Sequence, residues 1–195
     1  MAGVQSKTNE VSDRDLVMRC QAGHDRAFES LVIRHQARAV NVAWQLLGNR
    51  EDALEVAQDA FVRVYQSLDG FRGDCEFTTW LYRIVVNLAH NKHRWWRRRG
   101  RAETETMEGD RQFVAPTVPP DAAAVQNEFN RRLSAQIAAL PAAFRAVLVL
   151  RNVEGLSYDE IAAVLECSQG TVKSRIARAR EALREIMNHE DMPKH

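Results

Sequence analysis

Apolar residues recur every three to four positions through most of the 195-residue chain, as they do along one face of an α-helix. The alternating pattern of a half-buried β-strand with hairpin turns does not occur, and glycines number only 9. The pattern predicts an all-α fold. Its first three helices are expected from the capping sequence SDRD at 12–15 to near Gly23, at about 25–47, and at about 50–68.

The stretch FRGDCE, residues 71–76, predicts a loop because it contains Gly73 and Asp74. A fourth helix is expected to follow, with two faces of different chemistry. The apolar face, expected to pack inward, comprises Phe77, Leu81, Ile84, Leu88 and Trp95. The second stripe combines aromatic, amide and cationic side chains at helical spacing, at Trp80, Arg83, Asn87 and Arg94.

Apolar periodicity stops between about residues 98 and 124, where three of the five prolines and charges of both signs gather. Such a composition is typical of a linker. The helical pattern returns at Val125 and continues through a segment long enough for a small domain. We therefore predict two small helical domains, at 1–97 and 125–195, joined by a flexible linker at 98–124.

The total charge is nearly balanced, with 27 Lys and Arg residues against 26 Asp and Glu residues, so the distribution of charge is more informative. Residues 51–69 hold five acids and one base, whereas residues 87–101 hold six bases and no acid. The predicted third helix therefore has an acidic face, which suits either solvent or a basic protein partner. The end of the fourth helix is strongly basic.

Cys20, Cys75 and Cys167 lie far apart without a CxxC pair, which predicts neither disulfides nor a zinc site and fits a reducing cytoplasm. The polar start of the chain lacks the apolar segment of a signal peptide, and no stretch approaches 18 uncharged apolar residues. We expect neither export nor a membrane span. His90 and His93 have no third ligand nearby and are expected to face phosphate or solvent rather than a metal ion.

The segment GLSYDEIAAVLECSQGTVKSRIARAREAL, residues 155–183, has the pattern of a helix-turn-helix. Ser157 and Glu160 have the spacing of a capping box, CSQG provides the turn, and a second helix is expected to begin near Thr171. The apolar face of this second helix comprises Val172, Ile176, Ala179, Leu183 and Ile186.

The other side of this second helix is polar and basic. Ser174 and Arg178 lie opposite the apolar face, Lys173 and Arg175 flank it, and no acid occurs between 171 and 180. An α-helix fits the major groove of DNA, where Arg and Lys donate to guanine and hydroxyl groups hold phosphates. A solvated helix of an ordinary bundle also tolerates these charges, but the capping box, turn and one-sided charge together favour duplex DNA.

The stripe on the fourth helix suits unpaired DNA. An aromatic ring stacks on a base with about 1–3 kcal/mol, an amide reads a base edge, and arginines follow the backbone. Trp80 alone is equally compatible with a half-buried core residue. The adjacent loop at 71–76 favours the first interpretation, since a glycine-containing loop beside an aromatic ring forms a pocket for a flipped base.

Together these motifs resemble the bacterial extracytoplasmic-function (ECF) sigma factors. The resemblance spans roughly 12–100 and 125–187. The stretch EDALEVAQDAFVRVYQSLDGFRGDCEFTTWLYRIVVN is similar to the family region that joins polymerase binding to the −10 element, and GLSYDEIAAVLECSQGTVKSRIARARE is similar to the region that reads the −35 element. The resemblance implies sigma region 2 and region 4 domains that direct RNA polymerase to promoters, with no enzymatic chemistry, cofactor, metal or small-molecule substrate.

The resemblance also implies partners and contact residues. The partners are core RNA polymerase, through its β′ coiled coil and β subunit, promoter DNA, and an anti-sigma factor, which in this family is often membrane-anchored. The implied polymerase contacts are Asp52, Val56, Gln58, Asp59 and Tyr65. The implied −10 contacts are Arg63, Phe71, Gly73, Asp74, Cys75, Glu76, Trp80, Tyr82, Arg83, Asn87 and Arg94. The implied −35 contacts are Thr171, Lys173, Ser174, Arg175, Arg178 and Arg180.

The chain departs from the family pattern at three places. Leu54 stands where the family often has an acid, Cys75 and Glu76 leave the preferred −10 base undetermined, and Trp95-Trp96 matches no family motif. Two other functions compete with the sigma factor. A stand-alone helix-turn-helix regulator would bind a palindromic operator tightly without polymerase. An anti-sigma or adaptor protein would use the acidic helix but would not contact DNA, which the basic helices in both halves of the chain argue against.

Overall fold

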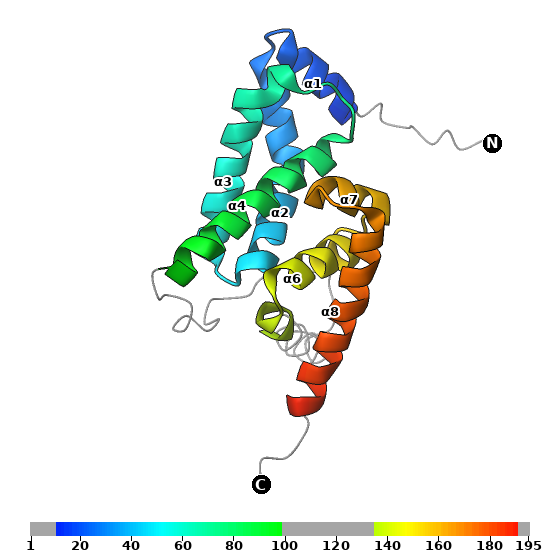
Figure 1. Ribbon diagram of the computed structural model, residues 1–195. Helices are drawn as coiled ribbons and strands as arrows, with labels where there is room; N and C mark the ends of the chain where they lie inside the picture. Colours follow the sequence, from blue (N-terminus) through cyan, green and yellow to red (C-terminus); the bar gives the residue numbers. More distant parts are fainter. Residues whose placement is uncertain (1–10, 99–134, 191–195) are drawn as a thin grey trace, which may run out of the picture.

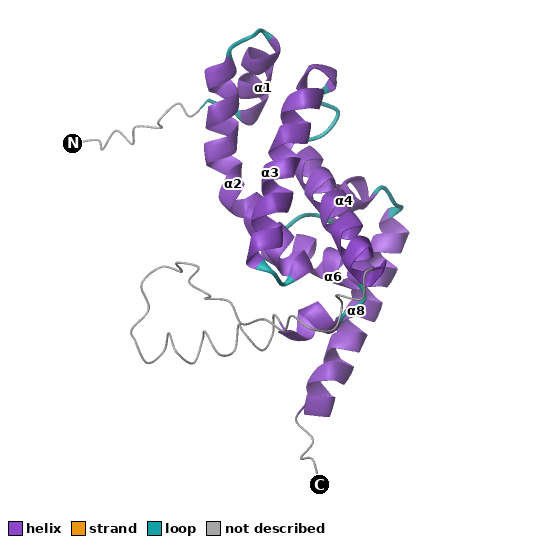
Figure 2. Ribbon diagram, turned by 90° about the vertical axis from the view of Figure 1, so that its left-hand side faces the viewer, coloured by secondary structure: helices purple, strands orange, loops and turns teal. Residues whose placement is uncertain are grey.

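The computed structural model describes residues 11–98 and 135–190 (Figures 1 and 2). No β-strand occurs in these two ranges, and the all-α prediction is confirmed. The predicted linker at 98–124 lies outside the described residues, except that Arg98 ends a helix. The elements are α1 (Asp13–Gln21), α2 (Asp25–Leu47), α3 (Arg50–Ser67), η1 (Leu68–Gly70), α4 (Phe77–Arg98), α6 (Ala142–Leu148), η3 (Val149–Val153), α7 (Tyr158–Leu165) and α8 (Gln169–Glu190).

Local capping residues explain where several helices begin. Ser12 precedes α1, and its hydroxyl accepts a hydrogen bond from the backbone N–H of Asp15 at 3.1 Å. Asn49 precedes α3 and accepts from the backbone N–H of Asp52 at 3.0 Å. Each cap satisfies a donor that the first turn of a helix leaves unpaired. The predicted starts of these helices are within one residue of the observed ones because the signals are local.

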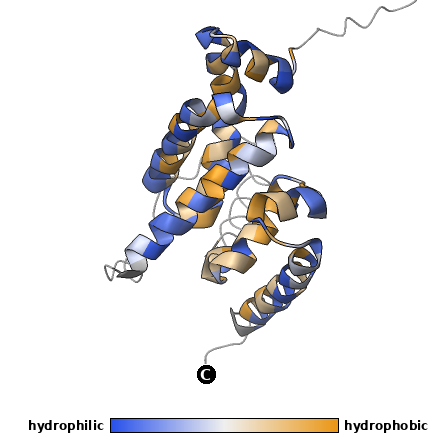
Figure 3. Ribbon diagram, turned by 45° about the horizontal axis from the view of Figure 1, so that its top comes forward, coloured by the Kyte–Doolittle hydropathy of each residue, from blue (hydrophilic) through white to orange (hydrophobic). Residues whose placement is uncertain are grey.

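The first helical unit is built from α1 to α4, with α2, α3 and α4 packed against one another. Its core follows the apolar periodicity of each helix and is made by aliphatic side chains with almost no exposure. Figure 3 shows the hydrophobic middle of α4 giving way to a hydrophilic C-terminal end. The largest fully buried side chains of this unit are Leu31, Val42, Val56, Val64, Leu81, Tyr82, Val85 and Val86.

The second unit comprises α6, η3, α7 and α8, with α8 packed against both α6 and α7 (Figure 1). Arg151 stabilises the connection into α7. Its guanidinium donates to the backbone carbonyl of Leu156 at 2.7 Å and lies over the Tyr158 ring at 5.1 Å. A cation held over an aromatic ring in this way is attracted to it electrostatically. The core of the unit is Leu148, Leu150, Ile161, Val164, Val172, Ile176 and Ala179.

The two units lie against each other, with α7 packed on α4 and both α6 and η3 packed on α2. Arg145 of α6 is 6% exposed and donates hydrogen bonds to the carbonyls of Leu46 on α2 at 2.5 Å, Leu140 at 3.1 Å, and Ala138. Burial lowers the pKa of this guanidinium. A buried cation needs such partners because its desolvation is otherwise costly, so Arg145 is a specific link between the units.

Candidate DNA and polymerase interfaces

The loop at 71–76 leads from η1 into α4 and is mostly exposed. Gly73 has a φ of +75°, a left-handed conformation that glycine adopts without strain. Gln21, the last residue of α1, fixes the start of the loop. Its side-chain amide donates to the backbone carbonyls of Leu68 and Phe71, each at 2.9 Å. Sequence analysis missed Gln21, because no local pattern links it to a loop about 50 residues away.

Trp80 is half-buried and is covered on one face by Phe71. The two rings are stacked, with centroids 4.6 Å apart and planes 22° apart, and the Phe77 and Trp80 rings meet edge-on with centroids 6.2 Å apart. The packing of Trp80 agrees with a half-buried core residue, and base stacking on its ring stays a prediction. A base that stacks here must either displace Phe71 or stack on the Phe71–Trp80 pair.

Tyr82 and Arg83 face the second helical unit. Tyr82 is buried, and its hydroxyl donates to Oε2 of Glu154 at 2.5 Å. Burial, together with the hydrogen bond and charge of Glu154, raises the pKa of Tyr82 above its usual range, so the phenol stays protonated. Arg83 donates from Nε to the carbonyl of Ala163 at 3.1 Å and lies 3.6 Å from the Glu166 carboxylate.

The burial of Tyr82 is contrary to the expectation that it surrounds a flipped base, because in this arrangement Glu154 holds its hydroxyl. Arg83 is engaged by α7, but 31% of its side chain is exposed, so its contact with the duplex edge stays a prediction. The remaining −10 candidates differ in this respect. Arg63, Asn87 and Arg94 are exposed to solvent. Within the loop, Gly73, Asp74 and Glu76 are exposed, while Phe71 and Cys75 are half-buried.

Two expectations at the end of α4 are wrong. Trp95 was assigned to the inward face but is 40% exposed, whereas the neighbouring Trp96 packs against the core. His90 was expected to face phosphate or solvent. Instead its Nε2 atom is buried, and the ring donates to the backbone of Ala142 at the start of α6, which raises its pKa less than burial lowers it. Burial is the main cause of its lowered pKa.

The five candidate polymerase contacts on α3 have different environments. Val56 is only 2% exposed and belongs to the core, so its proposed surface role is wrong. Asp52 forms an ion pair with Lys92 of α4 at 2.7 Å, and Glu55 is bound by the same lysine. Gln58, Asp59 and Tyr65 are exposed. The acidic face of α3 is therefore partly neutralised by its own neighbour, which the charge count did not reveal.

An apolar groove of about 510 Å³ lies between α2 and α3. Its rim includes Leu54, Val62 and Tyr65, all large apolar side chains exposed to solvent. The Tyr65 ring also packs edge-on against Phe28 at 5.0 Å. Contiguous exposed apolar surface typically marks a protein interaction site. Leu54, noted as a departure at an acidic position, thus belongs to a surface whose chemistry is mainly apolar.

The helix-turn-helix has the predicted form. Ser157 and Glu160 make the capping box, with reciprocal hydrogen bonds of 3.2 and 2.7 Å. The second helix begins at Gln169, two residues before the expected start, since Ser168 acts as its cap and accepts from the backbone N–H of Thr171 at 3.1 Å. Gln169 also donates to Asp159 at 2.9 Å, which ties the two helices together across the turn.

The buried and exposed faces of α8 agree with the predicted division. Val172, Ile176 and Ala179 are buried, and Leu183 and Ile186 are half-buried. The polar candidates lie on the outer side: Lys173, Ser174, Arg178 and Arg180 are exposed, while Thr171 and Arg175 are half-buried. This face is accessible to a DNA duplex in the present arrangement, unlike the buried Tyr82 side chain.

The sequence also led to expectations about disulfides, metal sites and membrane-spanning helices. Cys20, Cys75 and Cys167 are all free thiols. Within 11–98 and 135–190 no group of three or more His, Cys, Asp or Glu side chains has a geometry that could hold a metal ion. Among the same residues, no helix has the length and apolar content needed to span a membrane.

Comparison with known proteins matches both helical units. The family model of Sigma-70 region 2 matches residues 31–102, and that of Sigma-70, region 4 matches residues 130–183. The RNA polymerase sigma-H factor of Pseudomonas aeruginosa is 39% identical over 177 residues, which cover 88% of this chain and 91% of that protein. The ECF RNA polymerase sigma-E factor of Escherichia coli is 36% identical over 181 residues, covering 90% and 94%.

A solved structure supports the same assignment. CnrH, determined in complex with the cytosolic domain of CnrY, has a TM-score of 0.69 and 30% identity, covering 92% of this chain and 99% of that chain. A stand-alone helix-turn-helix regulator is not favoured, because relatives named as sigma factors align along nearly the whole chain. With regions 2 and 4 both present on one helical chain, the protein belongs to the extracytoplasmic-function sigma factors.

Proposed function

We propose that the protein directs promoter-specific transcription by contacting DNA at two points while bound to core RNA polymerase. The observation that carries this proposal is the basic, exposed outer face of α8, which shares a chain with the exposed loop at 71–76. The first suits the major groove of a duplex and the second suits a base taken out of the stack. The cytoplasm, where DNA and polymerase meet, is the corresponding compartment.

Two exposed arginines and a lysine of α8 have the chemistry for the −35 element. Lys173, Arg178 and Arg180 are exposed, and Ser174 lies among them. A bidentate arginine contact to a guanine contributes about 1–3 kcal/mol of discrimination. Replacing Arg178 by Ala should therefore reduce the preference for one base pair of the duplex element. An unchanged promoter preference would remove Arg178 from the base-reading residues.

The groove between α2 and α3 is the proposed polymerase site. Leu54, Val62 and Tyr65 offer apolar surface, and Asp59 adds an exposed negative charge beside it. An apolar centre with a charged rim is the usual composition of a protein interface. The β′ coiled coil would occupy this surface, and region 4 would contact the β subunit. An anti-sigma factor is the proposed inhibitory partner, consistent with the CnrH relative, which was solved with CnrY bound.

The packing of the two units implies that a change of arrangement accompanies promoter binding. Tyr82 cannot meet DNA while it is buried beside Glu154, and the Arg83 side chain is partly engaged by Ala163 and Glu166. Two weak sites gain affinity when a scaffold fixes their separation. Polymerase would provide that scaffold, so the free protein should bind promoter DNA weakly.

Single-round transcription tests the proposal. Purified core polymerase and a pool of promoter fragments are combined with and without the protein. Initiation that depends on the protein and selects a common pair of sequence elements is the expected result. Tight binding of duplex DNA without polymerase, and no transcript, would contradict it and support the stand-alone regulator.

A further inference from the structure

Gln169, the first residue of α8, pairs with Asp159 in the first turn of α7, across the turn of the helix-turn-helix. Its side-chain Nε2 donates to a carboxylate oxygen of Asp159 at 2.9 Å, and both residues are exposed. Gln169 shares a side of α8 with the exposed Lys173 and Arg180, at helical spacing. The N-terminal residues of a recognition helix reach base edges in the major groove. The −35 contacts implied by the sequence nevertheless do not include Gln169.

The hydrogen bond to Asp159 fixes which way the Gln169 amide faces. A carboxylate only accepts hydrogen bonds, so the amide nitrogen, and not the amide oxygen, must lie toward Asp159. One of the two N–H groups is used in this bond. Among the described residues, the Oε1 acceptor and the second N–H donor have no further hydrogen-bond partner. The exposed amide therefore presents one donor and one acceptor in a defined orientation.

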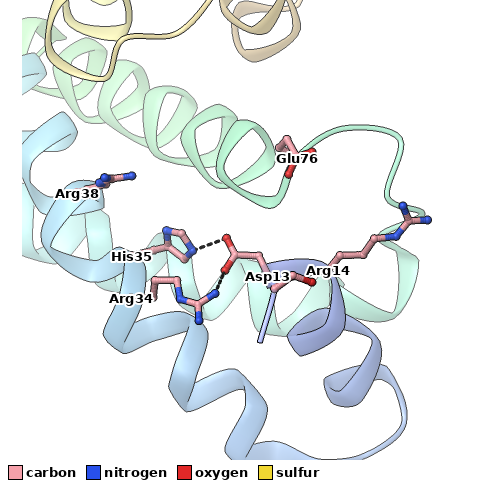
Figure 4. Close-up of a pocket in the computed structure, with 7 residues that line it drawn as sticks. Asp13, Arg14, Arg34, His35, Arg38 and Glu76 are labelled. Carbon is pink, nitrogen blue, oxygen red and sulfur yellow. Dashed lines mark hydrogen bonds and ion pairs between the residues drawn. The ribbon is translucent and has the colours of Figure 1, made fainter. Parts of the chain in front are cut away.

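Asp13 of α1 shows what a purely structural pairing looks like in this chain. One of its carboxylate oxygens accepts from Arg34 at 2.5 Å, and the other is 2.7 Å from Nε2 of the buried His35 (Figure 4). Both partners belong to α2, so the network joins two helices through groups that bind one another. The Asp159–Gln169 pair also joins two helices, but it leaves an exposed donor and acceptor on the amide.

The hydroxyl groups near Gln169 are engaged within the helix. Ser168 accepts from the backbone N–H of Thr171 at 3.1 Å, and the two hydroxyl oxygens are 2.9 Å apart. The Ser174 hydroxyl donates to the backbone carbonyl of Thr171 at 3.0 Å. A hydroxyl has a single proton, so Ser174 can only accept from DNA in this arrangement. Gln169 differs because its amide keeps a donor and an acceptor side by side.

We infer that Gln169 is a further specificity-determining residue of the −35 site, which reads adenine at one position, and that Asp159 is the positioning residue that orients it. In the major groove adenine presents the N6 amino donor and the N7 acceptor. Oε1 of Gln169 accepts from N6, and the remaining N–H donates to N7. Guanine presents two acceptors, O6 and N7, so its O6 would oppose Oε1. Cytosine and thymine satisfy only one of the two amide groups. This inference rests on the proposed function.

Two substitutions give this inference a signature in base preference. Gln169→Ala should remove the adenine preference at one position of the duplex element, by about fivefold or more, and leave the other positions unchanged. In Asp159→Asn the new side chain can donate as well as accept, so the Gln169 amide can turn over and present its NH₂ group to the groove. Two N–H donors match O6 and N7 of guanine. Asp159→Asn should therefore gain guanine at the same position, which misfolding cannot produce.

The test uses the holoenzyme reconstituted from core polymerase and the full chain. The probe is a pool of double-stranded promoter fragments randomised across the duplex element, and sequencing of the retained fragments gives the base frequencies at each position. Asn152→Ala on η3 and Glu185→Gln on α8 are the matched controls. They remove an exposed amide and an exposed negative charge from the same helical unit, and both should keep the wild-type frequencies.

The outcomes separate this inference from the proposed function. If the wild-type holoenzyme selects no sequence and starts no transcript, the proposed function fails. If it selects a duplex element, but Gln169→Ala and Asp159→Asn give the same base frequencies as the controls, the inference is wrong and the proposed function stands. Loss of the adenine preference in Gln169→Ala, without a gain of guanine in Asp159→Asn, would overturn the role of Asp159.

Discussion

The hydroxyl of Tyr82 donates a 2.5 Å hydrogen bond to Oε2 of Glu154, joining α4 to the segment that leads into α7. The two residues are 72 positions apart in the chain. Next to them, Arg83 binds the carbonyl of Ala163 and approaches Glu166. Tyr82 and Arg83, which were expected to contact unpaired DNA, thus form hydrogen bonds and an ion pair with the helical unit that contains α8. We therefore expect DNA binding by α4 to be linked to release of the second helical unit.

The first prediction concerns this contact. Glu154→Ala removes the acceptor of Tyr82, and a hydrogen bond to a charged group contributes about 1.5–3 kcal/mol. The variant should populate the separated arrangement more, and the free protein should bind a −10 oligonucleotide at least several-fold more tightly. Fluorescence anisotropy measures the change, with Glu185→Ala on the exposed side of α8 as the control. Equal affinities for wild type and Glu154→Ala would show that the contact does not restrain DNA binding.

The second prediction concerns the groove between α2 and α3. Val62 is exposed at its rim, so Val62→Asp should leave the fold intact while placing a charge in an apolar interface. We expect holoenzyme formation to weaken at least tenfold in a pull-down or native-gel titration. Val56→Ala is the informative comparison, because this buried residue should reduce stability without a direct effect on polymerase affinity. Normal polymerase binding by Val62→Asp would place the interface elsewhere.

The third prediction concerns Arg145, whose guanidinium is buried and donates to three backbone carbonyls. Arg145→Ala leaves these acceptors without their donor, and each buried unpaired group costs about 1–3 kcal/mol. The free energy of unfolding, measured with urea, should fall by at least about 2 kcal/mol. Arg184→Ala on the exposed face of α8 should change it little. A similar small loss in both variants would mean that water satisfies the carbonyls.

The fourth prediction concerns the turn of the helix-turn-helix. Glu166 follows α7 with a φ of +50°, a left-handed conformation that favours glycine. Glu166→Gly should raise the stability of the chain by about 1 kcal/mol, because the strain of an L side chain is removed. Its ion pair with Arg83 is exposed on the glutamate side and contributes little. Thermal unfolding of Glu166→Gly beside Glu166→Ala separates the two effects, since alanine removes the ion pair but keeps the strain. If Glu166→Gly melts no higher than Glu166→Ala, the turn is not strained.

The fifth prediction concerns pH. Burial is the main cause of the lowered pKa of both His35 and His90, and it outweighs the opposing effect of Asp13 on His35. The folded protein therefore binds fewer protons than the unfolded chain just below the usual histidine pKa of about 6.5. Stability is fully present above that pH and is lost as the pH falls through the lowered pKa values. Urea unfolding at pH 7.5 and 5.5 measures this loss.

His90→Gln provides the control for the pH effect. Glutamine does not titrate, so the variant should lose less stability between pH 7.5 and 5.5 than the wild type does. His24→Gln is the matched comparison, since His24 is exposed. If His90→Gln shows the same pH dependence as wild type and His24→Gln, then burial of His90 does not contribute.

Helix boundaries were predictable because their signals lie within a few residues of each other. Ser157 and Glu160 specify the start of α7, and Asn49 specifies the start of α3. The apolar periodicity of α8 likewise separated its buried and exposed faces. Val56 was misassigned although its spacing with Ala60 and Val64 already placed it on the buried face of α3. The spacing predicted a buried Val56, whereas the family motif implied a surface contact at the same residue.

Contacts between distant segments were not predictable in the same way. Arg145 meets Leu46 across 99 positions, and an arginine in an apolar stretch carries no mark of its acceptors. Asp52 is paired with Lys92, so counting acids on α3 overstated its negative charge. Trp95 was placed inward by periodicity alone, but a helix can extend past the core that its first turns cover. Each error concerns the tertiary contacts or burial of a side chain, and none concerns the helix to which the residue belongs.

The anchoring of the loop by Gln21 has a consequence for how promoter preference can change. Both acceptors of its amide are main-chain carbonyls, at Leu68 and Phe71, and every residue type supplies a carbonyl. The side chains that follow in the loop are therefore not needed to fix the position of its first residues. Substitutions at Arg72, Asp74, Cys75 and Glu76 can therefore change which base is read while Gln21 still holds the start of the loop, whereas Gly73 is constrained by its φ of +75°. These four positions are where new promoter preferences can arise without loss of the loop anchor.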